Sequence, residues 1–288
     1  MFAPTLLATL DAVCETGSFD LAAARVGVTP SAVSQRMKAL AEAAGGALFV
    51  RLGPAEPTAL GRRLLRHARE MAALDAALAA DLGQEGAPPA LAIAINADSL
   101  ETWAVPALAA VEGLRFDVVI DDQDHSADLL RRGEVSAAVT AQTRPLPGCD
   151  AYPLGALRYL AACSPGFRDR WFPDGPDAAA LARAPTLRFN PKDALQTRWI
   201  RQVTGEAINP PAHSLPATSP LQAALRAGLA WGVNPEGLMR PDLEAGHLVE
   251  LIPGATLETP LTWQVSRVMA DVLAPLTRAM RRAARDGM

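Results

Sequence analysis

The first 44 residues are predicted to fold as three short amphipathic helices. Apolar side chains recur every three or four positions along three runs: 2–16, 19–26 and 30–44. That spacing is typical of helices with one buried face. Ser18 and Thr29 precede the second and third runs, where a hydroxyl can cap a helix N-terminus. Pro30 fits the first helical position, because its missing N–H costs nothing there.

The third run has a polar face whose side chains suit the major groove of DNA. Its apolar face consists of Val33, Met37 and Leu40. The polar face carries two hydroxyls, an amide and two cations: Ser31, Ser34, Gln35, Arg36 and Lys38. Glutamine can bond an adenine edge, hydroxyls serve bases or phosphates, and cations neutralise phosphates. A solvated helix face is the alternative, but a helix, a tight turn and a capped helix together favour a helix-turn-helix.

A short strand with a turn is predicted next. Residues 48–51 are mostly apolar, and Gly53-Pro54 supplies the turn, which indicates a wing beside the helix-turn-helix. Arg51, at the end of this strand, is a candidate for a phosphate contact. A solvated cation is the alternative interpretation.

A long helix is predicted to begin after Thr58, its N-cap, and to end near Leu82. Two seam positions repeat every seven residues and are mostly apolar: Leu60, Leu64, His67, Met71, Leu74 and Leu78. A repeat sustained over about three heptads is typical of helices that pair between two copies. We expect His67 to pack in this seam rather than to bind a ligand. Such a dimer places two recognition helices roughly 34 Å apart, about one turn of DNA.

The pattern changes after a polar hinge at residues 83–90. Strand-type runs occur at 91–95, 116–120, 135–140, 158–163, 185–189, 230–234 and 261–268. Helical runs lie between and after them, at 98–111, 126–132, 165–171, 194–203, 219–227 and 270–285. Strands that alternate with helices predict a parallel sheet in an α/β domain. The number of strands favours two lobes over one.

Composition and charge narrow the class of protein. Half of the 288 residues are hydrophobic and a fifth are charged, which is typical of a globular chain. No apolar run approaches the roughly 20 residues of a membrane span, and no signal peptide is indicated, so we expect a cytoplasmic protein. The three cysteines are widely spaced and argue against a disulfide scaffold or a zinc site. The net charge is −4, and residues 1–70 carry eight cations against six acids, or +2, so DNA affinity must depend on where the charges lie.

Residues 1–82 resemble the N-terminal winged helix-turn-helix of LysR-type transcriptional regulators. The resemblance rests on many spaced positions: Gly17-Ser18-Phe19, Ala22-Ala23-Ala24, Val28 to Gln35, Lys38-Ala39-Leu40, Leu48 to Arg51 and Pro57 to Gly61. One departure is Ala41-Glu42, where the family has an acidic residue directly after the leucine. The implied DNA-binding residues are Thr29, Pro30, Ser31, Ser34, Gln35, Arg36, Lys38 and Arg51.

The same resemblance implies an α/β multidomain chain. Residues 1–57 form the winged helix-turn-helix, 58–82 the linker and dimerisation helix, and 83–90 the hinge. Residues 91–288 form a two-lobed, Rossmann-like effector-binding domain similar to periplasmic binding proteins. Lobe I covers about 91–160 and 266–288, and lobe II about 161–265. The implied assembly is a homodimer or a homotetramer.

Two predicted strands end in polar segments suited to a small ligand. In open α/β sheets, ligands bind at the carboxyl ends of strands, against helix N-termini. After the first strand, the Ser99 hydroxyl and nearby backbone N–H groups could hold a carboxylate; a helix cap is the alternative. The second strand leads to three carboxylates in four residues: Asp121, Asp122 and Asp124. Such a cluster repels itself unless a cation or solvent compensates, so it predicts either a solvated loop or a pocket for an ammonium or guanidinium group.

Three segments resemble the LysG/ArgP branch of the family: 96–103, Leu130 to Val135 and Leu154 to Tyr159. Members of that branch sense lysine, arginine or related amino acids and activate an amino-acid exporter gene. Under this resemblance Ser99 faces the effector's α-carboxylate, while Asp122 and Asp124 recognise its cationic end. Trp103 lines the pocket or is a buried core residue, and Ser219 contributes from the other lobe. No cofactor or metal is implied.

Other functions fit the sequence less well. A LysR-type regulator that senses another small molecule, such as an organic acid, is the nearest alternative. An enzyme is disfavoured, because the chain has no nucleophile elbow, phosphate-binding loop or metal-ligand spacing. A two-lobed solute-binding protein would need a signal peptide and would not need residues 1–82. The expected partners are double-stranded DNA, the effector, a second copy of the chain and RNA polymerase, without a membrane.

Overall fold

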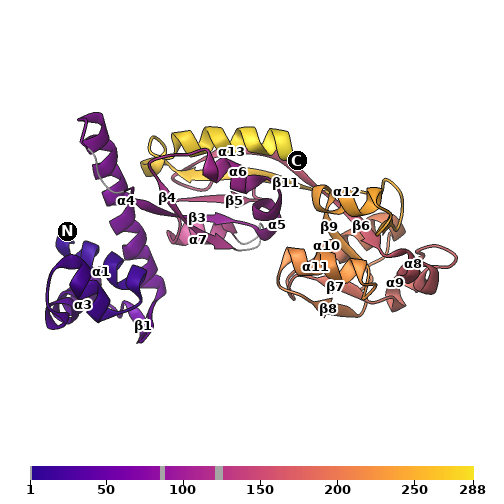
Figure 1. Ribbon diagram of the computed structural model, residues 1–288, viewed down its shortest axis with the longest axis horizontal. Helices are drawn as coiled ribbons and strands as arrows, with labels where there is room; N and C mark the ends of the chain where they lie inside the picture. Colours follow the sequence, from indigo (N-terminus) through magenta and orange to yellow (C-terminus); the bar gives the residue numbers. More distant parts are fainter. Residues whose placement is uncertain (1, 85–87, 121–125) are drawn as a thin grey trace.

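The computed structural model describes residues 2–84, 88–120 and 126–288, which form a small head, a long helix and two lobes in a row (Figure 1). The head consists of α1 (Pro4–Thr16), α2 (Phe19–Val26) and α3 (Pro30–Ala44), followed by the hairpin of β1 (Phe49–Leu52) and β2 (Ala55–Pro57). The predicted caps are confirmed: Ser18 Oγ accepts a hydrogen bond from the backbone N–H of Leu21, and Thr29 Oγ1 accepts one from Ala32. The three helices enclose a core of their own that includes Leu10, Val33 and Leu40.

Helix α4 (Ala59–Asp81) leaves the head and passes alongside the first lobe (Figure 1). Thr58 Oγ1 accepts from the N–H of Gly61 at 3.0 Å, as expected of its N-cap. A Cβ on Gly61 would lie 2.2 Å from the carbonyl oxygen of Leu48. Only glycine therefore lets α4 start this close to the hairpin.

The main sheet is mixed, not parallel as the sequence pattern predicted. Its order is β10 (Val249–Glu250), β6 (Cys149–Cys163), β11 (Leu257–Ser266), β5 (Ala137–Thr140), β3 (Ala90–Ile95) and β4 (Arg115–Ile120), and β9 (Gly232–Pro235) also pairs with β6. Strands β4, β3 and β5 are parallel, but β11 runs antiparallel to both β5 and β6. Pairing between distant segments sets these directions, which a local pattern does not reveal.

Strands β6 and β11 connect the two lobes (Figure 1). Toward one end, Thr262 to Val265 of β11 pair with β5; toward the other, Tyr159 to Ala162 of β6 pair with β9. The first lobe also holds α5 (Ala97–Ser99), a π-helical turn (Leu100–Ala104), α6 (Val105–Ala109), α7 (Ser126–Arg132), a 3₁₀ turn (Arg267–Met269) and α13 (Ala274–Gly287). The second holds α8 (Pro165–Trp171), α9 (Ala178–Arg183), β7 (Thr186–Arg188), α10 (Leu195–Thr204), β8 (Ala212–Ser214), α11 (Thr218–Arg226) and α12 (Glu236–Glu244).

The helix predicted over 98–111 is broken into three short pieces, α5, the π-helical turn and α6. The strand predicted from residue 158 instead begins at Cys149, and the sequence pattern did not indicate α9, β8, α12 or β10. No helix in the part of the chain that the structure describes has a stretch long and apolar enough to cross a membrane.

Candidate functional site

The polar face of α3 is open to solvent. Ser31, Ser34, Gln35 and Lys38 are exposed, while Val33, Met37 and Leu40 are buried against α1 and α2. Arg36 differs from this group, because it is half-buried and its Nη1 donates to Thr9 Oγ1 of α1 at 3.1 Å. Four side chains of α3 are therefore exposed on one face of the helix, whereas Arg36 binds α3 to α1.

The other predicted DNA-binding residues lie at the edges of that face. Thr29 Oγ1 caps α3 and lies 3.0 Å from Ser31 Oγ, and Pro30 is the first residue of the helix. Arg51 lies in the hairpin, where its Nε pairs with Glu56 Oε2 at 2.9 Å. Both members of that pair are exposed, so the pair adds little stability and leaves the Arg51 guanidinium accessible.

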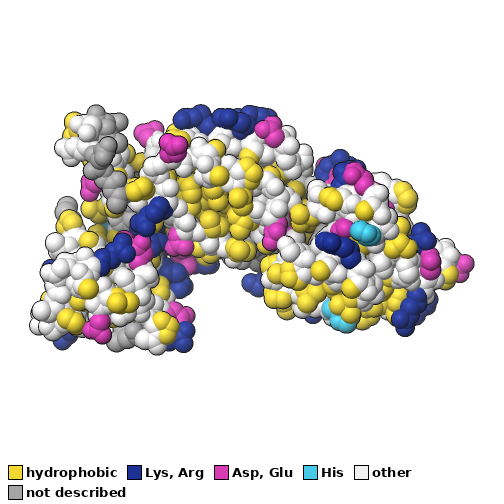
Figure 2. Space-filling view, in the orientation of Figure 1, with side chains coloured by type: hydrophobic (Ala, Val, Ile, Leu, Met, Phe, Trp, Pro, Cys, Tyr) yellow, Lys and Arg dark blue, Asp and Glu magenta, His cyan; other side chains and the backbone are white. Residues whose placement is uncertain are grey.

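Positive charge is not concentrated on the head. A band of exposed arginines runs along α13 instead, on the side of the first lobe away from α3 (Figures 1 and 2): Arg278, Arg281, Arg282 and Arg285. A duplex in contact with α3 of the same protomer lies away from this band. If α3 contacts DNA as the sequence predicts, its affinity comes from a few well-placed contacts rather than from a broad basic surface.

Helix α4 carries an uncovered apolar stripe toward its C-terminal end. Leu74 and Leu78 are 41% and 61% exposed. Two earlier positions of the predicted seam do not extend this stripe as apolar surface. Leu64 is buried in the core of the head, and His67 is exposed and does not pack within this protomer. Apolar side chains at i and i+4 on a helix with no neighbour on that side are typical of an interface.

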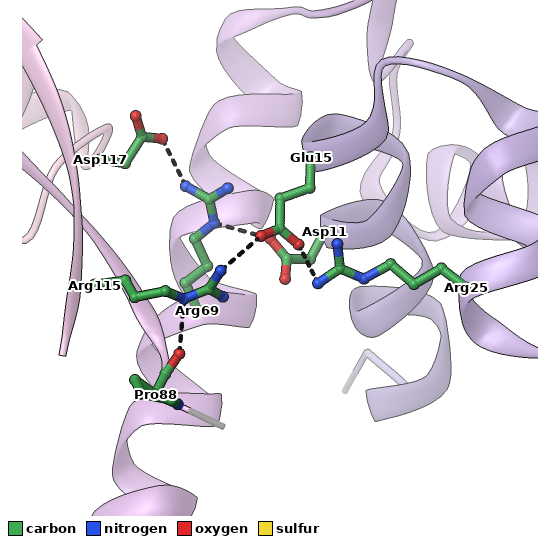
Figure 3. A network of polar contacts seen from close by, with 7 residues as sticks. All are labelled: Asp11, Glu15, Arg25, Arg69, Pro88, Arg115 and Asp117. Carbon is green, nitrogen blue, oxygen red and sulfur yellow. Dashed lines mark hydrogen bonds and ion pairs between the residues drawn. The ribbon is translucent and has the colours of Figure 1, made fainter. Parts of the chain in front are cut away.

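A polar network joins the head, α4 and the first lobe (Figure 3). It comprises Asp11, Glu15, Arg25, Arg69, Pro88, Arg115 and Asp117. Arg69 of α4 is nearly buried; its Nε donates to Asp11 of α1 at 2.8 Å and its Nη1 to Asp117 of β4 at 2.7 Å. A second contact also links α1 to β4, because Glu15 of α1 accepts a hydrogen bond from Arg115 of β4. Burial alone lowers the pKa of Arg69, but the two carboxylates outweigh burial and raise that pKa above its usual value.

A second set of contacts also joins α4 to the first lobe. Glu134 accepts from Arg62 of α4 at 2.8 Å and from Arg132 at 2.7 Å. Burial raises the pKa of Glu134, yet the two arginines outweigh it, so that pKa lies below its usual value. Glu70 of α4 accepts from the buried Ser136 hydroxyl at 2.9 Å. The first lobe is therefore joined to α4 at Glu134 and Ser136 as well as through Arg69.

Replacing Arg69 by methionine is expected to loosen the head from the first lobe. The substitution keeps an apolar stem but removes both ion pairs, and the carboxylates left behind are 33% and 58% exposed and can regain water. We expect the free energy of unfolding to fall by about 1–2 kcal/mol, with faster amide hydrogen exchange in α1. Arg63→Met, at an exposed position of the same helix, is the control. Unchanged exchange in α1 would show that packing alone holds the head.

A cavity of about 150 Å³ lies between the two lobes. Its polar lining consists of two carboxylates and three amides: Asn96, Asp98, Asn190, Asp193 and Asn234. Apolar side chains such as Phe189 and Leu221 complete the wall, and no lysine or arginine lines it among the described residues. At roughly 30 Å³ for each water in the liquid, this volume has room for about five waters.

Two side chains beside the cavity have unused hydrogen-bonding capacity. The Nδ2 and Oδ1 atoms of Asn96 and the Oγ atom of Ser99 are buried and have no hydrogen-bond partner among the described residues. Buried polar groups are nearly always hydrogen-bonded, so these atoms are suited to bind a polar group that enters beside them. Asn96 directly lines the cavity, whereas Ser99 lies one turn further along the chain and is not part of the wall.

Asp98 connects the lobes at this cavity. Its Oδ2 accepts from Tyr159 Oη at 2.9 Å and its Oδ1 from Thr218 Oγ1 of α11 at 3.3 Å. Asp193 is committed to its own loop, since its carboxylate accepts from the backbone N–H groups of Phe189 and Leu195. Of the two carboxylates in the cavity wall, Asp98 is therefore the one that bonds across the boundary between the lobes.

Two other predicted effector residues, Trp103 and Ser219, are not part of the cavity wall. Trp103 is buried near α13 and lines a separate groove, so the structure does not bring it to the cavity. Ser219 is exposed and its Oγ pairs with Glu101 across the lobes at 3.1 Å. Asp122 and Asp124 lie outside the described residues. None of the five polar residues of the cavity wall was predicted from the sequence, although the end of the first strand marked the location of Asn96 and Asp98.

Comparison with known proteins supplies the context for these sites. Residues 4–62 match the family model for the bacterial regulatory helix-turn-helix protein, lysR family, and residues 84–288 match the LysR substrate binding domain. The transcriptional regulator LysG of Mycobacterium tuberculosis is 43% identical over 280 residues, 96% of this chain and 92% of LysG. The crystal structure of ArgP from M. tuberculosis has a TM-score of 0.80 and 43% identity, and covers 99% of this chain and 97% of that one.

The name of a third relative refers to lysine export. The lysine export transcriptional regulatory protein LysG of Corynebacterium glutamicum is 39% identical over 290 residues, 99% of each chain. Its full-length structure with bound effector Arg has a TM-score of 0.68 and 38% identity, and it covers 99% of each chain.

Proposed function

Because this chain belongs to the LysR family of bacterial transcriptional regulators, we propose that it senses a basic amino acid, lysine or arginine, in the cavity between its lobes. It is a DNA-binding regulator and not an enzyme. One observation carries the proposal: the described cavity wall holds two carboxylates, three amides and no cation. A wall of that charge favours an ammonium or guanidinium group over an anion.

The site also has groups suited to the other end of an amino acid. The unpartnered amide of Asn96 can donate to a carboxylate, and the Ser99 hydroxyl lies in the next turn. The related LysG of C. glutamicum has arginine as its bound effector, which supports the same ligand class here. An organic acid, the alternative effector, would meet carboxylates without a compensating cation.

Binding of lysine and arginine by the purified full-length protein tests this proposal. We expect saturable binding of one or both in isothermal titration calorimetry and a rise in melting temperature, because a ligand that binds only the folded state stabilises it. Norleucine, which has the size of lysine without its side-chain amine, is the control. Equal binding of norleucine, or no response to either basic amino acid, would refute the proposal.

The regulator's wider role follows from the same premise. We propose that it acts in the cytoplasm as a homodimer or homotetramer and activates an amino-acid exporter gene through contact with RNA polymerase. The support for an export target is the name of the Corynebacterium relative. Ligand binding between the lobes would shift the first lobe, and the contacts of Arg69 and Glu134 would carry that shift to the head.

Two substitutions on α3 are expected to separate base reading from phosphate contact. Gln35→Ala should reduce affinity for the operator by about 1–3 kcal/mol and leave binding to random duplex unchanged, because a base-specific bond is lost. Lys38→Ala should weaken binding to both duplexes about equally and lower the salt dependence. Fluorescence anisotropy at several salt concentrations measures both effects. Full operator affinity in the Gln35 variant would remove that residue from the reading face.

A further inference from the structure

A chain of buried polar side chains runs from the cavity to α12 in the second lobe. It consists of Asn234 on β9, Gln222 on α11 and Asp242 on α12, each less than a tenth exposed. Only Asn234 lines the cavity. Asn234 Nδ2 donates to Gln222 Oε1 at 3.2 Å, and Gln222 Nε2 donates to Asp242 Oδ2 at 2.5 Å.

At the Asp242 end of this series of side chains, Gln222 meets only hydrogen-bond acceptors. Asp242 Oδ2 also pairs with Arg226 Nε at 3.0 Å, and Oδ1 lies 3.4 Å from His247 Nδ1, so the carboxylate acts as an acceptor. Gln222 Nε2 meets a second acceptor, the carbonyl oxygen of Leu238, at 3.3 Å. Because both neighbours only accept, the amide nitrogen of Gln222 must point toward them.

The orientation of Gln222 then determines that of Asn234. Because the nitrogen of Gln222 is directed at α12, its oxygen faces Asn234. Asn234 must therefore donate to that oxygen with its own side-chain nitrogen. With Nδ2 used in this way, Oδ1 is the side-chain polar atom that Asn234, a residue of the cavity wall, has left for a ligand. A reversed Asn234 would turn its NH₂ group into the cavity and leave two amide oxygens facing each other.

We propose that Asp242, which lies outside the cavity, acts through Gln222 as a positioning residue that makes Asn234 a hydrogen-bond acceptor for the effector. The inference rests on the proposed function, since the cationic groups of a basic amino acid carry only N–H donors. An oxygen fixed in advance as an acceptor favours an N–H donor. An amide that turns freely could equally well direct its NH₂ group at a carboxylate or hydroxyl of another ligand. The second lobe thereby contributes to selectivity without a charge of its own in the contact.

A double-mutant cycle tests this assignment in the full-length protein. In Asp242→Asn the new amide can donate to Gln222, which allows both amides to reverse. We expect this variant to bind lysine or arginine about tenfold more weakly in calorimetry, the cost of one hydrogen bond to a charged group. Asn234→Leu should cause a loss of similar size. The double variant should be no weaker than Asn234→Leu alone, because Asp242 acts only through Asn234.

The other results separate the possibilities. Losses that multiply in the double variant, or an unchanged dissociation constant in Asp242→Asn, would overturn the positioning role. Arg226→Gln is the matched control, because it removes an ionic partner and leaves the carboxylate an acceptor; its affinity should stay within about threefold of the unaltered protein. If Asp242→Asn does not fold, Gln222→Met replaces it in the same cycle with the same expectation. Failure of the unaltered protein to bind either amino acid would instead refute the proposed function.

Discussion

Replacing Leu74 and Leu78 together by glutamate is expected to separate the proposed dimer and to lower operator affinity by about a hundredfold or more. Both leucines lie on the uncovered stripe of α4, 41% and 61% exposed. In a pair of helices they would meet their counterparts, and four glutamates there would repel one another. The DNA loss follows because two linked heads bind with an effective concentration that raises affinity by roughly 10²–10⁴ over one head.

Sedimentation velocity and fluorescence anisotropy on a two-half-site duplex measure both parts of this prediction. Ala72→Glu with Ala79→Glu adds the same charge to α4 away from the leucine stripe and serves as the control. The control should remain dimeric and bind the operator normally. A variant that stays dimeric despite glutamates at Leu74 and Leu78 would place the interface elsewhere on the molecule.

The head could be predicted closely because its signals are local. Ser18, Thr29 and Thr58 cap the helices that follow them, and Gly61 stands where a backbone approach admits no side chain. Helical spacing also separated the buried face of α3 from its polar face. Spacing did not distinguish Arg36 from its neighbours, because the partner that turns it inward, Thr9, belongs to another helix.

The cavity could be located from the sequence only in part. The end of the first strand indicated the segment that carries Asn96 and Asp98, since strand ends in α/β sheets meet ligands. Asp193 and Asn234 join it only after β6 and β11 bring the second lobe against the first, a pairing between residues about a hundred apart. Trp103 stood near the right strand end, yet the π-helical turn places it in the core beside α13.

The second large effect is expected at the cavity, where Asp98→Asn should weaken lysine and arginine binding by roughly a hundredfold. Asparagine keeps the shape and can still bond Tyr159 and Thr218, so the main loss is the negative charge that we propose to recognise the effector cation. Removing one member of a desolvated charge pair costs about 2–5 kcal/mol. Calorimetry with each amino acid measures the change.

A control and a rival assignment sharpen this test. Glu101→Gln removes a carboxylate that lies outside the cavity wall and accepts from Ser219, and it should change affinity by less than about threefold because exposed pairs contribute little. The family resemblance implied that Asp122 and Asp124 recognise the cationic end of the effector, so Asp122→Asn and Asp124→Asn belong in the same series. A loss in those two variants with none in Asp98→Asn would assign the cation to the segment after β4. A loss confined to Asp98→Asn would instead make the charge that recognises the effector the same one that Thr218 bonds across the lobes, so that binding and lobe closure depend on a single carboxylate.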